Sequence, residues 1–513
     1  MRIAGLLLVL SIVPVHADEE LDAALVRLRR ASTADAPAEI AAIVGRAPDR
    51  AVLLDRLESA LVVPADKAGW HVAEARDENG VVRPFEYYVP ASLVGKRTPV
   101  PLVVHLHGGV SRPAWFPQPG RRSTGSQWVP SADEHGFLLA FPYGRQDCVW
   151  WSAAGAANVR AVIREMKRRA PVDDRRVIGT GFSDGASGCY YLAMAEPEPF
   201  AAFLPLNGHF AVAASASNEN LYLANLRDQS LFIAQTSDDQ LYPVASMMPH
   251  IDAALAAGVR LTFVNYPRGG HRPVYFDEQR AAMVRFVLQT PREARPARFA
   301  WRTATARLGV RYGVEILDIG AREGDPAAAA DHQVMSTPGR VRLGVQVDRN
   351  YAGPGVRIDE VVAGSVAAAA GLQKGDVLVR VGRTDTVDMG GLRTALGALT
   401  YGDESEFAVR RGDAEVVCTG KFPEFRARPV YRREGVTAEL RYEAEGNDVQ
   451  LHCRSVGKLR ILLPNGDTPS LQVNGKPVQP AVETLDVKRI LQDYARHADR
   501  GRIWDRVVTV IVP

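Results

Sequence analysis

Six short apolar runs between residues 101 and 266, most of them followed by a helical pattern, constrain the fold more than any other feature of this chain. The runs lie at residues 101–107, 137–142, 176–180, 203–206, 231–235 and 261–266. Between two of them, residues 158–169 place apolar side chains on one helical face, and Asn158 is predicted to cap that helix. A last helix is predicted at residues 276–289. Alternating strands and helices predict an α/β fold, with a mostly parallel sheet covered by helices on both faces.

The chain of 513 residues is too long for one ordinary core, and other patterns flank the α/β part. Three amphipathic helices are predicted at residues 21–30, 37–44 and 51–61. After residue 290 the apolar period changes to two, which predicts strands at residues 307–318, 436–454, 458–463 and 471–473. Asn474-Gly475 is a strong hairpin-turn signal.

These patterns give a domain plan with one discontinuous domain. The strand-rich segments 296–335 and 428–513 are each too small to bury a good core, so we expect them to form one β-rich domain together. The plan is listed in chain order: a signal peptide at 1–17, a helical segment at 18–65, an α/β domain at 66–292, the β-rich domain at 296–335 and 428–513, and an inserted domain at 341–423.

The N-terminus has the pattern of a secretory signal peptide. Arg2 supplies the positive charge, residues 3–15 form an apolar run, and Val15-His16-Ala17 is a small-residue cleavage site. The run is shorter than the roughly 20 residues of a spanning helix, and no cysteine follows it for a lipid anchor. We expect cleavage after Ala17, no membrane anchor afterwards, and a periplasmic or secreted protein.

Charge and cysteine content exclude some classes of function. The 62 basic and 59 acidic residues give a net charge of +3 without long like-charged blocks, so nucleic acid is not an expected partner. No pair of the four cysteines has metal-ligand spacing, and we expect neither a metal nor a cofactor. Two disulfides in any of three pairings, or free buried thiols, remain open for Cys148, Cys189, Cys418 and Cys453.

A Gly-x-Ser-x-Gly motif at residues 181–185 follows an apolar strand and precedes a helix. This context is that of a nucleophile elbow, in which glycines flank a serine held at a strained turn because strand and helix crowd there. Ser183 is the predicted nucleophile, in preference to a simple Gly/Ser turn.

A serine nucleophile needs a histidine base and an acid, in the chain order Ser, acid, His. His271 follows the strand at 261–266 and is the only histidine that fits both order and context. The acid should follow the strand at 231–235, where Asp238 and Asp239 are neighbours; the spacing to Pro243 favours Asp239. Two oxyanion donors are predicted: the backbone N–H of Asp184, and that of Gly108 or Gly109 in the loop after the first buried strand.

Residues 70–289 resemble a family of secreted esterases that includes polyhydroxybutyrate-depolymerase-like and feruloyl-esterase-like proteins, close to prolyl-oligopeptidase-type peptidases. The resemblance rests on the elbow, on His107-Gly108-Gly109 and on three further motifs, listed here: residues 141–144, Trp150-Trp151 and residues 174–177. It implies an α/β-hydrolase fold. Asp184 departs from the family, which often has a neutral residue after the nucleophile. Trp150 and Trp151 could wall an acyl pocket, and they are equally well explained as core residues.

The stretch at residues 341–423 resembles a PDZ domain of the kind appended to exported bacterial proteases. Leu343-Gly344-Val345 matches the carboxylate-binding loop of that family, and residues 364–378 match its longest signature. The resemblance implies that the loop binds a peptide C-terminus, while the peptide adds a strand beside residues 344–347 and a helix at 391–399 forms the other wall.

Three functions fit these features. The leading hypothesis is hydrolysis of a small-molecule or polymeric carboxylic ester through an acyl-Ser183 intermediate. A serine peptidase of prolyl-oligopeptidase type is the first alternative, which the PDZ resemblance favours. The second is an inactive hydrolase scaffold that recruits partners through the PDZ domain.

Overall fold

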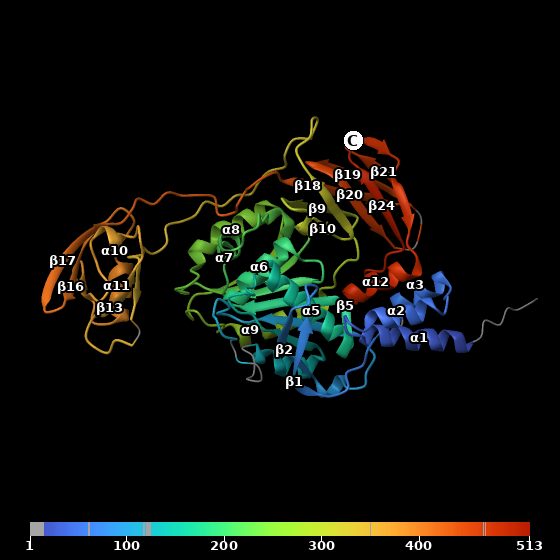
Figure 1. Cartoon of the computed structure of the whole chain (residues 1–513), viewed down its shortest axis with the longest axis horizontal. Coiled ribbons are helices and arrows are strands. Elements are labelled where there is room, and N and C mark those ends of the chain that lie inside the picture. The colour runs from blue at the N-terminus through green and yellow to red at the C-terminus, as the bar shows by residue number, and fades with distance from the viewer. Residues whose placement is uncertain are drawn as a thin grey trace, which may run out of the picture. The chain divides into compact units, whose positions relative to one another are not determined.

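The computed structural model describes residues 15–59, 62–115, 118, 125–348, 350–464, 466 and 468–513. The chain divides into two compact units, one formed by residues up to Val334 together with Val430–Pro513, and the other by Met335–Pro429. The first unit contains the α/β part, the N-terminal helices and the β-rich part, and Figure 1 labels many of their elements.

The α/β part is built on an eight-stranded sheet in the order β1-β2-β4-β3-β5-β6-β7-β8. β1 and β2 are antiparallel to their neighbours, and the pairs from β4 to β8 are parallel. Every apolar run used for prediction is a strand of this sheet. The bounds are Gly69–Arg76 (β1), Val82–Val89 (β2), Val100–Leu106 (β3), Leu138–Pro142 (β4), Val172–Phe182 (β5), Ala202–Leu206 (β6), Ser230–Thr236 (β7) and Arg260–Tyr266 (β8).

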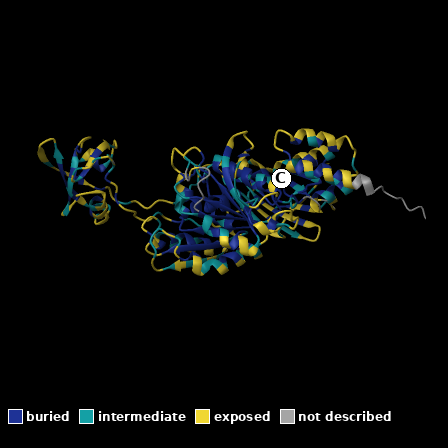
Figure 2. Ribbon diagram, turned by 90° about the horizontal axis from the view of Figure 1, so that it is seen from below, coloured by how far each residue is buried: buried dark blue, intermediate teal, exposed yellow. Residues whose placement is uncertain are grey.

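Helices cover both faces of the sheet, which confirms the predicted α/β class. One face packs on Ala153–Arg169 (α5), Asp184–Ala195 (α6), Phe210–Ala216 (α7) and Val244–Ala256 (α8). The other packs on Val129–His135 (α4) and Phe276–Gln289 (α9). Figure 2 shows the strands between these layers in the colour of buried residues. Strands covered on both sides are largely apolar: β4 and β6 are apolar throughout, and β3 is apolar except for the buried His105.

The predicted cap of α5 was wrong. α5 begins at Ala153, and the Ser152 hydroxyl accepts the cap hydrogen bond from the Gly155 N–H at 3.1 Å. Asn158 lies inside the helix, where its buried amide donates to the Tyr143 carbonyl at 2.8 Å. Asn158 precedes the apolar stripe and so has the sequence position of a cap. The small residues 153–157 nevertheless extend the helix by more than one turn before it.

The N-terminal helices pack on the C-terminal end of the chain. Val15–Arg30 (α1), Ala36–Val44 (α2) and Arg50–Ser59 (α3) share a core with Val487–His497 (α12) and with Ile503 and Trp504. Residues 1–14 of the predicted signal peptide lie outside the described residues. In the part of the chain that is described, no helix combines the length and apolar character needed to cross a membrane.

The β-rich part consists of two five-stranded sheets around one core. Both sheets combine strands from before and after the second unit, in the orders β10-β11-β20-β24-β23 and β22-β21-β19-β18-β9. The bounds are Arg298–Thr303 (β9), Val310–Arg311 (β10), Val314–Ile319 (β11), Ala438–Glu445 (β18), Asp448–Arg454 (β19), Val456–Leu463 (β20), Ser470–Val473 (β21), Lys476–Val478 (β22), Ala481–Thr484 (β23) and Arg506–Ile511 (β24).

Two strands predicted in this part were wrong. Residues 436–454 form the antiparallel hairpin of β18 and β19, with its turn at Gly446-Asn447. Residues 307–318 form a short 3₁₀ turn at Ala306–Leu308 and then the hairpin of β10 and β11. Tyr312 and Gly313 both have positive φ, +50° and +74°, as a two-residue hairpin turn requires. The first position of such a turn is usually Gly, Asn or Asp, but here it is Tyr312. Because Tyr312 also fits the alternation of apolar residues, the period-two pattern continues through the turn and hides it.

The second unit is a six-stranded sheet with two helices around its own core. Its elements are Val345–Val347 (β12), Val356–Val361 (β13), Val366–Ala369 (α10), Val377–Val381 (β14), Thr384–Asp385 (β15), Met389–Gly397 (α11), Glu404–Arg411 (β16) and Ala414–Lys421 (β17). β12 is an edge strand that pairs only with β13 within this unit.

Candidate active site

Ser183 lies at a tight turn between β5 and α6. Its φ of +60° and ψ of −123° are a strained backbone conformation for a non-glycine residue. A Cβ at Gly181 would lie 2.5 Å from the Gly185 backbone, and one at Gly185 would lie 1.9 Å from the Leu106 carbonyl oxygen. The motif therefore needs both glycines because β3, β5 and α6 approach too closely for any side chain.

The side chains of Ser183, His271 and Asp239 form a continuous hydrogen-bonded relay. His271 Nε2 lies 2.8 Å from Ser183 Oγ, and His271 Nδ1 lies 2.8 Å from Asp239 Oδ2. The three residues follow β5, β8 and β7, at the edge where the carboxyl ends of the parallel strands meet. The imidazole is partly exposed at 21%, whereas the Asp239 side chain is fully covered.

Hydrogen bonds keep Asp239 charged in its buried position. Its Oδ1 accepts from the backbone N–H groups of Leu241 and Tyr242, and its Oδ2 accepts from the Asn207 amide at 2.9 Å. Burial by itself would raise the pKa of Asp239, but the bonds from His271, Asn207 and the two N–H groups lower it to about 2. The carboxylate is thus ionised at neutral pH and can hold the imidazole in one orientation.

Asp238, the neighbouring candidate acid, is exposed, and its carboxylate accepts from a backbone N–H of the loop that carries His271. Its Oδ1 accepts from the Gly270 N–H at 2.7 Å. The bonds from the N–H groups of Gly270 and Gly269 lower its pKa. Asp238 therefore fastens the loop that carries His271 and does not contact the ring.

The predicted oxyanion loop lies directly over the nucleophile. A Cβ built on Gly108 would be 3.0 Å from Ser183 Cβ and 3.5 Å from Ser183 Oγ, so the backbone of this loop reaches the reacting atom. Gly109 has a φ of +64°, which favours glycine. Asp184 begins α6, and its N–H belongs to the first turn, where backbone donors have no helical acceptor.

His107 and Trp150 support this loop from the core. The Gly144 N–H donates to His107 Nε2 at 2.9 Å, so Nδ1 carries the proton and donates to the Gly108 carbonyl at 2.8 Å. Burial lowers the pKa of His107 to about 4, which keeps the ring neutral. The Trp150 indole N–H donates to the His107 carbonyl at 2.8 Å. Trp150 is fully buried and Trp151 is 7% exposed, so both belong to the core.

Two contributors to the site were missed at the sequence level. Asn207, which follows β6 at a φ of +48°, donates to Asp239 and to the Thr236 hydroxyl. The Tyr242 hydroxyl donates to Asp184 Oδ1 at 3.2 Å, and its ring lies edge-on to His271 with centroids 5.5 Å apart. The position of Tyr242 directly before Pro243 in the acid loop was the available signal.

Similar esterases often have a neutral residue after the nucleophile, and the bonds of Asp184 to Tyr242 and to the oxyanion loop explain the aspartate in this chain. Asp184 Oδ2 accepts from the Val110 N–H at 3.0 Å, and Val110 directly follows the two glycines of the oxyanion loop. The carboxylate therefore joins the oxyanion loop, the start of α6 and the acid loop. Burial and the Asp184 carboxylate raise the pKa of Tyr242, so its hydroxyl keeps its proton.

All four cysteines are free and buried. Burial raises the pKa of Cys148 to about 11 and that of Cys453 to about 12, so neither is a reactive thiolate at neutral pH. Among the described residues there is no group of three or more His, Cys, Asp or Glu side chains arranged to hold a metal ion.

In the second unit, the residues predicted to bind a carboxylate lie at the start of the edge strand β12. Gly344 has a φ of +85°, and a Cβ there would lie 2.1 Å from Ser365 Cβ. Leu343 is buried in the core of the unit, while Val345 begins β12. α11 carries Leu392 and Ala395 into the same core.

The geometry of the first unit defines a fold, and a family model matches the second unit. A parallel sheet with Ser183 at a strand-to-helix elbow, an acid after β7 and a histidine after β8 defines the α/β-hydrolase fold. Residues 333–397 match the PDZ domain family. The chain is thus an α/β-hydrolase-fold protein that carries a PDZ domain.

One curated relative is the bifunctional acetylxylan esterase/xylanase XynS20E of Neocallimastix patriciarum, 27% identical over 147 residues. The match covers 28% of this chain and 21% of the relative, so it spans about a fifth of that protein. Two solved structures that align are a thermostable esterase and the Pyrococcus horikoshii acylaminoacyl peptidase. The esterase is 20% identical with a TM-score of 0.36, and the alignment covers 44% of this chain and 63% of the esterase. The peptidase is 13% identical with a TM-score of 0.36, and the alignment covers 45% of this chain and 43% of the peptidase.

Proposed function

We propose that this protein is a serine hydrolase that cleaves carboxylic esters through an acyl-Ser183 intermediate. The observation that carries the proposal is the Ser183–His271–Asp239 relay, with two hydrogen bonds of 2.8 Å. The acetylxylan esterase activity in the name of the curated relative favours an ester over other acyl substrates.

In this reaction Ser183 Oγ attacks the ester carbonyl while His271 Nε2 takes its proton. The N–H groups of Asp184 and of Gly108 or Gly109 stabilise the oxyanion, and Asp239 stabilises the charged imidazole. His271 then protonates the leaving alcohol. Water attacks the acyl-serine with His271 as the base, releasing the carboxylic acid and restoring Ser183.

Hydrolysis of short p-nitrophenyl esters tests this proposal. We expect turnover by the wild-type protein, and a loss of about 10⁴-fold or more in kcat for Ser183→Ala. A fluorophosphonate probe should label the wild-type protein and not this variant. A folded wild-type protein that neither turns over the esters nor reacts with the probe would favour the inactive scaffold instead.

A serine peptidase is the second candidate, favoured by the PDZ domain, because such domains bind peptide C-termini. The same relay would cleave an amide. Aminoacyl-nitroanilide peptides separate the two activities: a kcat/KM on these above that on the esters would replace the esterase proposal.

The PDZ domain is proposed to bind a peptide C-terminus at Leu343, Gly344 and Val345, with the peptide as an added strand beside β12. Titration of the full chain with free-acid and C-terminally amidated versions of one peptide tests this, since only the free acid should bind.

Export is proposed from the N-terminal pattern, and mass spectrometry of protein from its host should find a chain beginning at Asp18.

A further inference from the structure

A large cavity in the first unit is not lined by Ser183 or by its hydrogen-bonded partners. It has a volume of about 1250 Å³ and is bordered by α2, α5, α12 and the region of β10. These elements come from the helical segment, the α/β part and the β-rich part, and Figure 1 shows α2, α5 and α12 in the same part of the unit. Neither Ser183, His271 nor Asp239 lines it.

One wall of this cavity is an apolar stripe. Pro37, Ala41 and Val44 follow one another at helical spacing on α2, are exposed, and line the cavity. At 1.5 Å per residue the stripe is about 10 Å long. Ile163 and Leu308 contribute further apolar surface. A stripe of this kind on a helix normally covers a core, but here it faces open space.

The rest of the lining is charged, with an excess of basic groups. Seven basic side chains line the cavity against four acidic ones. Each acid already has a basic partner. The pairs are Arg160 with Glu78 and Glu196, Arg502 with Glu198, and Lys167 with Asp499.

Three basic residues of the lining form no ion pair among the described residues: Arg164, Lys488 and Arg496. Arg164 is only 9% exposed and donates to the carbonyls of Arg76 and Arg496. Burial, followed by the charges of Arg502, Arg496, Lys167 and Arg164, lowers the pKa of the neighbouring His497 well below its ordinary value. Asp493 interacts with Arg496 from outside the lining, and Glu78 and Glu165 interact with Arg164. Basic side chains still outnumber acidic ones in the lining, which favours an anion over a cation.

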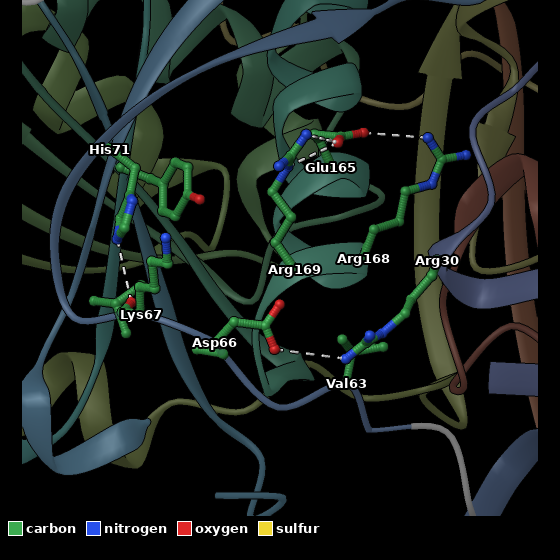
Figure 3. Close-up of a pocket in the computed structure, with 11 residues that line it drawn as sticks. Arg30, Val63, Asp66, Lys67, His71, Glu165, Arg168 and Arg169 are labelled. Carbon is green, nitrogen blue, oxygen red and sulfur yellow. Dashed lines mark hydrogen bonds and ion pairs between the residues drawn. The ribbon is translucent and has the colours of Figure 1, made fainter. Parts of the chain in front are cut away.

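A second pocket, of about 370 Å³, differs in this respect (Figure 3). Its basic side chains are largely compensated, since Arg168 and Arg169 both pair with Glu165, and Arg30 lies 3.9 Å from Asp66. Its apolar lining residues Val63, Ala65 and Val89 are buried, so they present little apolar surface. Positive charge alone does not distinguish the larger cavity; the combination of excess basic charge with an apolar stripe does.

We propose that the larger cavity binds a single-chain anionic amphiphile, with its acyl or alkyl chain along the α2 stripe and its head group near Arg496, Arg164 and Lys488. Burial of apolar chain surface and attraction between the anionic head group and these basic side chains would both favour binding. A carboxylate and a phosphate head group share the required chemistry. The ligand would reach the last turn of α6, at Ala195, far from the nucleophile at the other end of that helix.

Calorimetric titration of the full chain carrying Ser183→Ala tests this without turnover at the nucleophile. We expect decanoate, decyl phosphate or both to bind at one site per chain, and the tighter of the two identifies the head group. Butyrate is shorter by six CH₂ groups and should bind about 3000-fold more weakly if the whole chain is buried, because each buried CH₂ contributes about 0.8 kcal/mol. Decyltrimethylammonium, with the same chain and opposite charge, should not bind.

Matched variants locate the site. Arg496→Glu and Val44→Asp should each weaken decanoate binding about tenfold, by reversing one charge and by placing a charge in the stripe. The controls are Arg489→Glu and Ala42→Asp, which make the same changes at exposed positions of the same helices outside the lining, and should bind as the parent does.

The proposal is overturned if no saturable binding occurs, or if the trimethylammonium compound binds as tightly as decanoate. It is equally overturned if each control weakens binding as much as its partner. Unchanged affinity in both Arg496→Glu and Val44→Asp would place the ligand elsewhere. Circular dichroism of all four variants separates loss of a site from loss of the fold.

Discussion

Asp238 and Asp239 are adjacent in the chain, but the acid loop places them in opposite environments. Asp239 is buried, bonded to His271 and surrounded by donors, whereas Asp238 is exposed and binds a backbone N–H. Chemically identical side chains therefore receive different roles from the turn that follows β7.

The two aspartates predict different effects of the same substitution. Asp239→Asn should lower kcat by about 10⁴-fold, because the amide cannot hold the required imidazole tautomer or stabilise its charge. Asp238→Asn retains an acceptor for Gly270 and should change kcat by less than about tenfold. Steady-state kinetics on a p-nitrophenyl ester measures both; equal losses would contradict the assignment of the acid.

Tyr242 predicts a smaller effect through the loops around Ser183. Tyr242→Phe removes one hydrogen bond to Asp184, about 1 kcal/mol, so we expect kcat/KM to fall about fivefold. Fluorophosphonate labelling of the variant should remain complete at long times, since Ser183 and His271 are intact. A loss as large as that of Asp239→Asn would instead mean that Tyr242 takes part in the chemistry.

At the scale of elements, the approach of α6 to β3 and β5 fixes the nucleophile. Helix and strands meet at glycines, and the elbow conformation at Ser183 persists because the surrounding sheet holds it. The strain at the serine and the packing of the helix therefore depend on the same contacts.

This packing predicts that Gly185→Ala will be severely destabilising. The added methyl would lie 1.9 Å from the Leu106 carbonyl, so α6 must move away from β3, lowering Tm and abolishing ester hydrolysis. The control is Gly397→Ala, at the last residue of α11, where nothing lies within 4 Å of the added Cβ and Tm should change little. Differential scanning calorimetry compares them; an unchanged Tm for Gly185→Ala would contradict the close packing.

Strand pairing across the second unit predicts the result of limited proteolysis. Cuts in the connections near residues 335 and 429 should release the PDZ unit, while residues 430–513 stay bound to the rest, because β18 pairs with β9 and β20 pairs with β11. Size-exclusion chromatography of the digest checks this. A free, folded C-terminal fragment would show that the β-rich part does not need both segments.

At the scale of the whole molecule, a buried ionic cluster connects the N-terminal helices, the α/β part and the C-terminal segment. Lys167 lies 3.0 Å from Asp174 and 3.1 Å from Asp499, and Arg292 lies 2.8 Å from Asp499. Arg29 of α1 lies 3.6 Å from Asp174, and Arg500 lies 2.7 Å from it. Removing water from these charges is costly, and only the complete set of partners compensates for it.

The cluster predicts stability that is lost in acid. Burial would raise the pKa of Asp174 and Asp499, but the surrounding Lys and Arg charges lower both below their ordinary values. Their contribution is therefore present above the unfolded pKa near 4 and declines as the pH falls through the lower folded values. Asp499→Asn should lower the free energy of unfolding at pH 7 by about 3 kcal/mol and flatten its decline below pH 4. Urea unfolding at several pH values measures this; parallel curves for the two proteins would contradict it.

The sequence by itself determined the parts of this protein that depend on local chemistry. Apolar runs located the six strands from β3 to β8, because strands covered on both faces are largely apolar, but they did not locate the antiparallel strands β1 and β2. Ser183 and His271 were identified because glycine spacing and chain order follow from the geometry of an elbow, and the PDZ signature rests on glycines at fixed positions.

Only the tertiary structure decided what depends on contacts between distant segments. The turn at Tyr312 was hidden because the side-chain alternation continues through it, and the Ser152 cap because Asn158 offered the same local signal. Asn207 and Tyr242 became part of the site through bonds to Asp239 and Asp184, which lie 32 and 58 residues away along the chain. The ionic cluster and the large cavity exist only where α1, α2, α5 and α12 meet, since no local pattern specifies which charges will be buried together.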